Sequence, residues 1–376
     1  MTTPKPVGVV GLGTMGLGIA QVYAQAGFDV VATDALAAAR ENFLHRLNAI
    51  LTERVTTGKL APDVRDATLA RIKIAENVDG LRDAGLVIEA IIETLDAKRD
   101  LFSKLEAVVA PDTVLATNTS SLSVGAAASG MKHPRRILGL HFFNPAPVMK
   151  LVELVAHKMT GDSAIAAARS LTESAGKTVI ACADRPGFIV NRCARPYYGE
   201  ALALLEEGRS ATEVDAAMVA AGYRLGPFSL IDLIGADINL AATRGLSAAM
   251  DQHPRYHVFD ALVAQVAKGE LGRKTRRGFI VPETPGATPS DAAHIVLRIE
   301  AALANEAASL LCEGGVDETG IETAMKLGLN FPRGPFEAAR THGLALVRAT
   351  LVNLEAAAPP HLKGRYRISP ALEAMT

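Results

Sequence analysis

Short apolar runs alternate with longer amphipathic stretches through the N-terminal half of the chain. The apolar runs predict buried strands at residues 6–10, 28–33, 72–75, 85–90, 113–117, 137–142, 151–156 and 178–183. Between them, apolar residues recur every three or four positions, which predicts helices at about residues 15–26, 35–56, 61–71, 96–109 and 163–175. Strands that alternate with helices pair in parallel through crossover connections. The pattern therefore predicts an α/β fold with a doubly wound, mainly parallel sheet.

A glycine-rich turn joins the first predicted strand to the helix that follows it. Gly11 permits a tight turn, Gly13 lets backbone amides approach a pyrophosphate, and Gly16 lets the helix pack closely on the sheet. The next strand ends at Asp34, whose carboxylate can accept hydrogen bonds from ribose hydroxyls and would repel a 2′-phosphate. A structural glycine turn is the alternative for the motif alone. The full order of strand, turn, helix, strand and acid predicts a Rossmann-type NAD site. Its residues are Gly11, Gly13, Thr14, Met15, Gly16 and Asp34.

Polar residues stand at the ends of several predicted strands, where ligands bind in such sheets. A dehydrogenase that oxidises an alcohol needs a base, and histidine, with an ordinary pKa of about 6.5, suits that role. His141 and Glu153 are twelve residues apart, with a proline-rich bend at 144–147 between their strands. A hairpin-like return would bring the two within hydrogen-bond reach, where the carboxylate would orient the imidazole. On spacing alone, a satisfied core histidine and a glutamate at a strand edge stay open as the alternative.

At these residues the chain resembles the L-3-hydroxyacyl-CoA dehydrogenase family. The resemblance covers about residues 5–280, and the run from Gly139 to Glu153 is its most specific part. The matching segments are residues 11–16, Glu93 with Lys98, 118–121, 139–145, 147–153 and 184–192. This likeness implies reversible, NAD-dependent oxidation of an L-3-hydroxyacyl-CoA thioester to the 3-ketoacyl-CoA. Fatty-acid β-oxidation, aromatic-acid breakdown and short-chain hydroxybutyrate metabolism would all use this chemistry.

The resemblance also implies a role for each polar residue. His141 would be the general base and Glu153 would orient it, while Ser120 and Asn191 would bind the 3-oxygen and thioester region of the substrate. Asp34 would bind the adenosine ribose. The nicotinamide end of the cofactor site would be lined by Glu93, Lys98, Asn118, Ser120 and Asn144. For Ser120 and Asn118, capping of the following helix is the alternative role, compatible with the first.

Lys274 matches a further family position near the cofactor, but the chain departs from the family pattern there. Relatives usually read Lys-Thr-Gly-x-Gly-Phe-Tyr, whereas this chain reads Lys-Thr-Arg-Arg-Gly-Phe-Ile over residues 274–280. Arginine at position 276 cannot cheaply adopt the positive φ that glycine allows, so we expect a different loop. A solvated basic turn is the simpler interpretation of Arg276 and Arg277, ahead of contact with CoA phosphates.

The C-terminal half contains an internal repeat. Residues 199–208 align with 305–314 at six of ten identical positions, and Gly-Pro-Phe recurs at 226–228 and 334–336. We therefore expect an NAD-binding domain at 1–183 followed by two all-α copies, at 184–281 and 291–376, with a proline-containing linker between the copies. Because Leu297 replaces Asn191, the second copy is expected to be structural. Single-copy relatives dimerise through this domain, so the second copy is expected to substitute for a partner. The expected state is a monomer with an internal pseudo-dimer, or a homodimer.

The composition of the chain limits which binding partners and which cellular compartment we expect. The chain of 376 residues has 39 basic and 40 acidic side chains, which gives no reason to expect nucleic acid or a membrane surface as partner. Three cysteines without paired spacing suggest neither a disulfide framework nor a metal site. No signal-peptide pattern precedes the first apolar run. We therefore expect a cytoplasmic, metal-free, monofunctional enzyme.

Two alternative functions stay open. One is a dehydrogenase of a free 3-hydroxy acid, a polyol acid or a carnitine-like substrate, with the same fold and the same histidine–glutamate pair. The aromatic pair Phe142-Phe143 and the segment Met149-Lys150 favour the CoA thioester instead. The other is a non-catalytic NAD-binding protein, and the intact set of polar residues at the predicted site argues against it.

Overall fold

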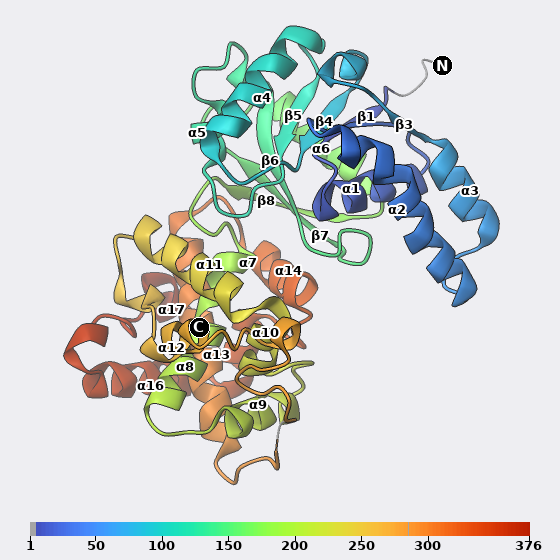
Figure 1. Cartoon of the computed structure of the whole chain (residues 1–376). Coiled ribbons are helices and arrows are strands. Elements are labelled where there is room, and N and C mark those ends of the chain that lie inside the picture. Colours follow the sequence, from blue (N-terminus) through green and yellow to red (C-terminus); the bar gives the residue numbers. More distant parts are fainter. Residues whose placement is uncertain (1–4, 285) are drawn as a thin grey trace. The chain divides into compact units, whose positions relative to one another are not determined.

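The computed structural model describes residues 5–284 and 286–376, and the chain divides into two compact units between Arg185 and Pro186 (Figure 1). The first unit holds one eight-stranded sheet in the order β3-β2-β1-β4-β5-β6-β7-β8. Neighbouring strands are parallel except for β6 and β7, which are antiparallel. The strands are β1 (Val7–Val10), β2 (Val30–Thr33), β3 (Ile72–Ile74), β4 (Leu86–Glu89), β5 (Val114–Thr117), β6 (Ile137–Phe142), β7 (Leu151–Ala156) and β8 (Thr178–Ala183). The predicted doubly wound, mainly parallel sheet is confirmed.

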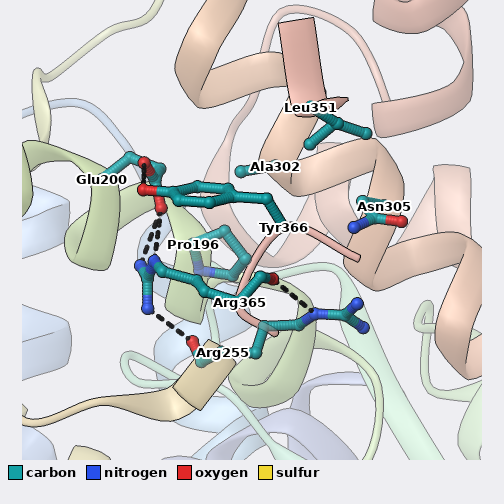
Figure 2. A pocket seen from close by; sticks show the side chains of 8 residues that line it. All are labelled: Pro196, Glu200, Arg255, Ala302, Asn305, Leu351, Arg365 and Tyr366. Atoms are coloured by element: carbon teal, nitrogen blue, oxygen red, sulfur yellow. Dashed lines mark hydrogen bonds and ion pairs between the residues drawn. The ribbon is translucent and has the colours of Figure 1, made fainter. Parts of the chain in front are cut away.

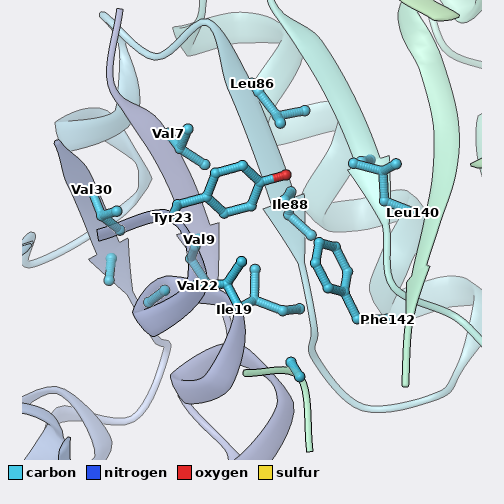
Figure 3. Packing of buried hydrophobic residues seen from close by; sticks show 14 of the residues in the cluster. Val7, Val9, Ile19, Val22, Tyr23, Val30, Leu86, Ile88, Leu140 and Phe142 are labelled. Carbon is cyan, nitrogen blue, oxygen red and sulfur yellow. The ribbon is translucent and has the colours of Figure 1, made fainter. Parts of the chain in front are cut away.

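Helices cover both faces of this sheet. They are α1 (Thr14–Gln25), α2 (Ala37–Thr56), α3 (Pro62–Ala70), α4 (Leu95–Val108), α5 (Val124–Ala128) and α6 (Asp162–Ser174), with short 3₁₀ turns at Val78–Leu81 and Pro134–Arg136. One apolar core packs α1, α2 and α6 against the strands. Figure 3 shows the part of this core between α1 and the strands. In it Tyr23 is fully buried, and its hydroxyl lies 2.8 Å from Oγ1 of Thr172, which joins α1 to α6. Burial raises the pKa of Tyr23 far above its usual value. Because Phe142 packs edge-on against the same ring, its neighbour His141 points to the opposite face of the strand.

The second unit is helical over its described residues, apart from one isolated bridge between Gly272 and Arg277. Its first half contains α7 (Val190–Cys193), α8 (Arg195–Glu206), α9 (Ala211–Ala220), α10 (Pro227–Ile234), α11 (Ala236–Ala249) and α12 (Asp260–Ala267), with 3₁₀ turns at Pro254–Tyr256 and Arg273–Thr275. Its second half contains α13 (Ala292–Glu313), α14 (Glu318–Leu329), α15 (Pro335–His342), α16 (Leu344–Ala357) and α17 (Pro370–Ala374), with a 3₁₀ turn at Pro360–Leu362. Helix α13 is packed against α8 and α9 of the first half and against α15, α16 and α17 of its own half.

The two halves of this unit differ where the repeat begins. The first half starts with two helices, α7 and α8, whereas the second starts with the single helix α13. Pro196 lies in the first turn of α8, where its missing N–H and fixed φ favour the start of a new helix. The residue 106 positions later is Ala302, which lets α13 continue without interruption.

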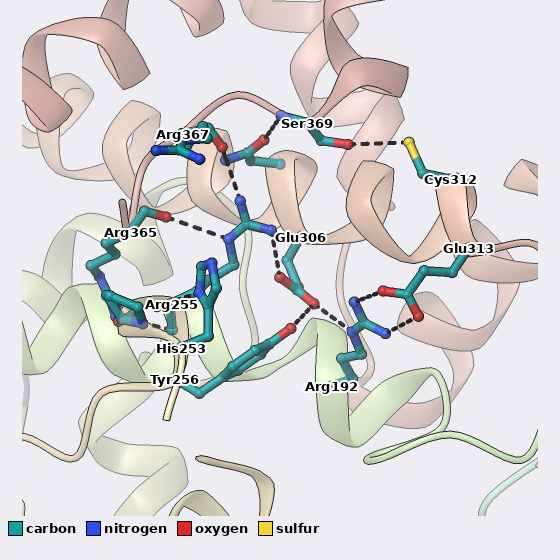
Figure 4. A network of polar contacts seen from close by, with 12 residues as sticks. Arg192, His253, Arg255, Tyr256, Glu306, Cys312, Glu313, Arg365, Arg367 and Ser369 are labelled. Atoms are coloured by element: carbon teal, nitrogen blue, oxygen red, sulfur yellow. Dashed lines mark hydrogen bonds and ion pairs between the residues drawn. The ribbon is translucent and has the colours of Figure 1, made fainter. Parts of the chain in front are cut away.

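Buried ion pairs join the two halves with a reciprocal pattern. Nε of Arg192 in the first half lies 2.6 Å from Oε1 of Glu306 in the second (Figure 4). Nε of Arg298 in the second half lies 2.9 Å from Oε2 of Glu200 in the first. Arg298 and Glu306 lie 106 residues after Arg192 and Glu200, so they are the equivalent residues of the second half. Each arginine therefore binds the glutamate of the opposite half. Self-complementary contacts of this kind define the interface of a two-fold dimer, and here they lie within one chain.

Further groups complete each pair. Glu200 also accepts hydrogen bonds from Nε of Arg365 at 2.8 Å and from the hydroxyl of Tyr366 at 2.9 Å (Figure 2). Equivalent bonds reach Glu306 from Arg255 and Tyr256. Burial would raise the pKa of Glu200, but the guanidinium groups of Arg365 and Arg298 outweigh burial and hold that pKa below its usual value. Glu200 is therefore charged, and both carboxylates accept hydrogen bonds from several donors, as buried polar groups require.

Candidate active site

His141 and Glu153 are directly opposite each other in the antiparallel pair formed by β6 and β7. Nδ1 of His141 lies 2.6 Å from Oε2 of Glu153, and the two residues are 6% and 0% exposed. The predicted hairpin-like return is therefore present. With the Nδ1 proton directed at the carboxylate, the neutral imidazole carries its lone pair on Nε2, where it can accept a proton. The pair has the geometry of a general base with an orienting acid.

Two contacts hold the neighbourhood of His141 in place. Oδ1 of Asn118, at the end of β5, accepts a hydrogen bond of 2.8 Å from the backbone N–H of Phe142. The bend between the two strands is held by Lys177, whose Nζ donates to the carbonyl oxygens of Ala146 at 2.5 Å and Met149 at 2.8 Å. Burial lowers the pKa of Lys177 to about 8. Sequence reasoning missed Lys177, because nothing in its own segment indicates that it reaches a bend 28 to 31 residues earlier.

The glycine turn after β1 has the shape that a dinucleotide pyrophosphate requires. Gly11 has a φ of +93°, and a Cβ atom at Gly16 would lie 1.7 Å from the carbonyl oxygen of Gly11, so helix α1 is pressed against the turn. A Cβ atom at Gly13, by contrast, would meet nothing within 4 Å. Gly13 is also the N-cap of α1 and has no side chain to satisfy the first-turn amides. These exposed amides and the open space in front of them fit an anionic group.

Asp34 follows β2, and its carboxylate stabilises the glycine turn through hydrogen bonds. Its Oδ2 accepts a hydrogen bond of 2.7 Å from the N–H of Leu12, and its Oδ1 accepts one of 2.8 Å from the N–H of Leu36. Each carboxylate oxygen has further lone pairs that ribose hydroxyls can use. Asp34 therefore combines support of the glycine turn with the acidic character expected beside an NAD ribose.

A buried lysine joins two acids near the ends of β4 and β5. Nζ of Lys98, which is 0% exposed, lies 2.8 Å from Oε1 of Glu89 and 3.2 Å from Oε2 of Glu93. Burial would raise the pKa of Glu93, but the hydrogen bond from Thr119 and the charge of Lys98 hold it below its usual value. Glu89 was not among the predicted site residues. A glutamate that ends an apolar strand at the carboxyl edge of the sheet is the signal that would have revealed it.

The helix-capping alternative is wrong. The N-cap of α5 is Ser123, whose Oγ accepts a hydrogen bond from the N–H of Ala126, so neither Asn118 nor Ser120 has that role. The backbone N–H of Ser120 instead donates to Oε1 of Glu93 at 3.1 Å. Ser120 and Glu93 are therefore in contact, whereas Asn118 binds the backbone of Phe142 and Asn144 is exposed in the bend after β6.

The second unit carries the two remaining candidates. Asn191 is half-buried on the short helix α7, and its carbonyl accepts a hydrogen bond from Arg195. Nζ of Lys274 lies 2.5 and 2.6 Å from the two carboxylate oxygens of Asp237. The expectation about Arg276 is corrected: it adopts the left-handed conformation with φ of 58° and ψ of 19°, as a glycine would. The loop therefore keeps this turn at the conformational cost of a non-glycine residue there.

Among the described residues, no cluster of three histidine, cysteine, aspartate or glutamate side chains is arranged to hold a metal ion. Within the same part of the chain, every helix is too short or too polar to cross a membrane.

Comparisons with known proteins identify the family of the chain. The family model described as 3-hydroxyacyl-CoA dehydrogenase, NAD binding domain, matches residues 6–185, and the model of the C-terminal domain matches residues 187–281 and 294–376. The 3-hydroxyadipyl-CoA dehydrogenase of Escherichia coli K12 is 41% identical over 282 residues, which are 74% of this chain and 59% of that protein. The chain thus matches less than two thirds of that relative.

Other relatives match over nearly their whole length. The 3-hydroxybutyryl-CoA dehydrogenase of Bradyrhizobium diazoefficiens is 40% identical over 73% of this chain and 94% of its own. A crystal structure of 3-hydroxybutyryl-CoA dehydrogenase from Escherichia coli K12 superposes with a TM-score of 0.90 at 32% identity, covering 99% of this chain and 98% of that one. The chain therefore belongs to the 3-hydroxyacyl-CoA dehydrogenase family, with one match to its NAD-binding domain and two to its C-terminal domain.

Proposed function

We propose that the chain interconverts L-3-hydroxyacyl-CoA and 3-ketoacyl-CoA thioesters with NAD, and that His141 is the general base of this reaction. The observation that carries the proposal is the 2.6 Å contact between His141 and Glu153 on paired strands. It sits in a chain that has the NAD-binding domain of a dehydrogenase family. The acyl-CoA substrate follows from the family, whose members compared above act on CoA thioesters by name.

The residues of the chain divide the work between proton transfer and positioning. NAD, when bound, accepts the hydride from the carbinol carbon. Nε2 of His141 takes the proton of the 3-hydroxyl group, and the carboxylate of Glu153 stabilises the imidazolium that forms. Both side chains are buried, so this attraction acts in a medium less polar than water. Ser120 and Asn191 hold the 3-oxygen and the thioester region of the substrate.

The cofactor is held by groups of three kinds. The amides around Gly13 bind the pyrophosphate, and Asp34 binds the adenosine ribose. Polar side chains around the end of β4 bind the nicotinamide end. The residues assigned to the cofactor are Gly11, Gly13, Thr14, Met15, Gly16, Asp34, Glu93, Lys98, Asn118, Ser120, Asn144 and Lys274.

A single-chain enzyme in the cytoplasm is the state that we propose. The reciprocal pairs of Arg192 and Arg298 supply within one chain the contacts of a two-fold interface, which supports a monomer with an internal pseudo-dimer. Sedimentation at micromolar concentration tests this, and an obligate dimer joined through α8 contradicts it. Cys182 and Cys312 form no disulfide in the part of the chain that the structure describes, which suits a reducing compartment.

The proposed activity is tested by NADH oxidation with 3-ketoacyl-CoA substrates of increasing chain length, alongside free 3-keto acids. The wild-type chain should prefer the CoA thioesters. The variant His141→Ala should lose about 10²- to 10⁴-fold in kcat, as loss of a general base predicts, and should bind NADH as before. His45→Ala, an exposed histidine on α2, is the matched control and should be as active as wild type. Near-normal turnover of His141→Ala would reject the assigned base.

A further inference from the structure

Helix α2 places a basic side chain against the glycine turn. Nη1 of Arg46 donates a hydrogen bond of 3.0 Å to the carbonyl oxygen of Leu12, which lies between Gly11 and Gly13. The N–H of the same residue is bound by Asp34. Leu12 is thus held on one side by an acid and on the other by a base, and both side chains come from beyond β2.

The charge of Arg46 is not balanced by its surroundings. Its side chain is exposed, and no carboxylate of the described residues lies within 4.0 Å of its guanidinium group. A guanidinium has five N–H donors, and the bond to Leu12 uses one of them. Arg40, six residues earlier on α2, differs because it donates to the carbonyl oxygens of Asp34 and Ala35.

A cation without an acidic partner beside this turn can bind an anionic ligand. The turn already offers first-turn amides without a cap, and the space in front of Gly13 is open. A guanidinium is planar and forms charge-assisted, often bidentate, hydrogen bonds to phosphate oxygens. We propose that Arg46 binds the pyrophosphate of the nicotinamide dinucleotide and so completes the phosphate site that the glycine turn begins. The proposal rests on the NAD site and not on the role of His141.

The test is NADH binding measured by fluorescence titration in the absence of any CoA compound. Arg46→Gln should weaken NADH binding about tenfold at low salt, the size expected for one charge-assisted hydrogen bond. Arg46→Lys should recover part of this loss, since lysine keeps the charge without the planar fork. Lys59→Gln is the charge-matched control. Lys59 lies beyond the far end of α2, about 15 Å or more along the helix axis, so its charge is screened from the turn.

The salt dependence of NADH affinity distinguishes two roles of Arg46, which are binding of phosphate and support of the glycine turn. If Arg46 binds phosphate, the affinities of wild type and Arg46→Gln should converge as ionic strength rises towards 1 M. A deficit that persists undiminished at high salt would mean that the side chain only braces Leu12, and would overturn the proposal. Unchanged NADH affinity would overturn it as well. If that result came with a raised KM for acyl-CoA, Arg46 would belong to a CoA phosphate instead. Loss of turnover in His141→Ala has no bearing on these outcomes.

Discussion

Arg192 and Arg298 occupy equivalent positions in the two helical halves, and each binds carboxylates of the opposite half. Both arginines are nearly fully buried, and each also reaches a second, partly exposed glutamate seven residues after the first. Such an exchange cannot form within one half alone, because each half supplies a cation to the other and receives one from it. The two halves therefore depend on each other for neutralisation of their buried charges.

The first prediction concerns this dependence. Glu306→Gln removes the charge that faces Arg192 and Arg255 but keeps the shape of the side chain. Because Arg255 then loses its acidic partner and the buried Arg192 keeps only the partly exposed Glu313, the free energy of unfolding should fall by about 3–5 kcal/mol. Urea unfolding followed by circular dichroism measures the change.

A surface pair supplies the control for that variant. Glu173 lies 3.2 Å from Arg169 on α6, with side chains 47% and 37% exposed. Glu173→Gln should change the free energy of unfolding by less than about 1 kcal/mol, as exposed pairs usually do. Equal effects of the two substitutions would show that the buried pairs do not hold the halves together.

The second prediction concerns acid stability. Because its folded-state pKa is held below the usual carboxyl value by Arg365 and Arg298 despite burial, Glu200 binds fewer protons in the folded state than in the unfolded state. Its contribution to stability is therefore full above about pH 4.5 and is lost as the pH falls through the lowered pKa. The variant Glu200→Gln should be less stable at neutral pH and should lose less stability than wild type between pH 5 and about pH 3. Parallel acid denaturation curves for the two proteins would contradict this.

Sequence patterns predicted the sheet and its central site more fully than the contacts around them. The positions of β6 and β7 followed from two apolar runs and the bend between them, whereas spacing alone left the approach of His141 to Glu153 open and the family resemblance favoured it. Glu89 and Lys177 were missed because their partners are set by packing between distant segments, which no local pattern encodes. The reciprocal arginines were missed for the same reason, although the repeat that generates them was visible. Arg276 shows the converse, since tertiary structure imposed a left-handed turn against residue preference.

The third prediction is that Gly16 and Gly13 of the glycine turn have different roles, the first in stability and the second in cofactor binding. Gly16→Ala places a Cβ atom 1.7 Å from the carbonyl oxygen of Gly11, so α1 must move away from the glycine turn, at a cost of about 3 kcal/mol or more. Gly13→Ala meets no atom within 4 Å and keeps an allowed φ of −69°, so its free energy of unfolding should stay within about 1 kcal/mol of wild type.

NADH titration completes the comparison of the glycines. The added methyl group at position 13 occupies the space that we assign to the pyrophosphate, so Gly13→Ala should fold normally but bind NADH at least about tenfold more weakly. Thermal unfolding of the free protein and fluorescence titration measure the two effects separately. A Gly13→Ala variant with wild-type NADH affinity would place the pyrophosphate elsewhere.

The last prediction tests whether Glu153 acts through His141. Glu153→Gln keeps the volume of a fully buried side chain but replaces an acceptor-only carboxylate with an amide, which can donate to Nδ1. The imidazole would then favour the tautomer with its proton on Nε2, the atom that must accept the proton of the substrate. We expect kcat to fall by about 10²- to 10⁴-fold, while NADH affinity and the thermal midpoint stay close to wild type. Glu173→Gln again serves as control, with unchanged kcat. If the variant lost its fold and its NADH affinity together with its turnover, Glu153 would be a structural residue of β7 rather than the orienting partner of the base.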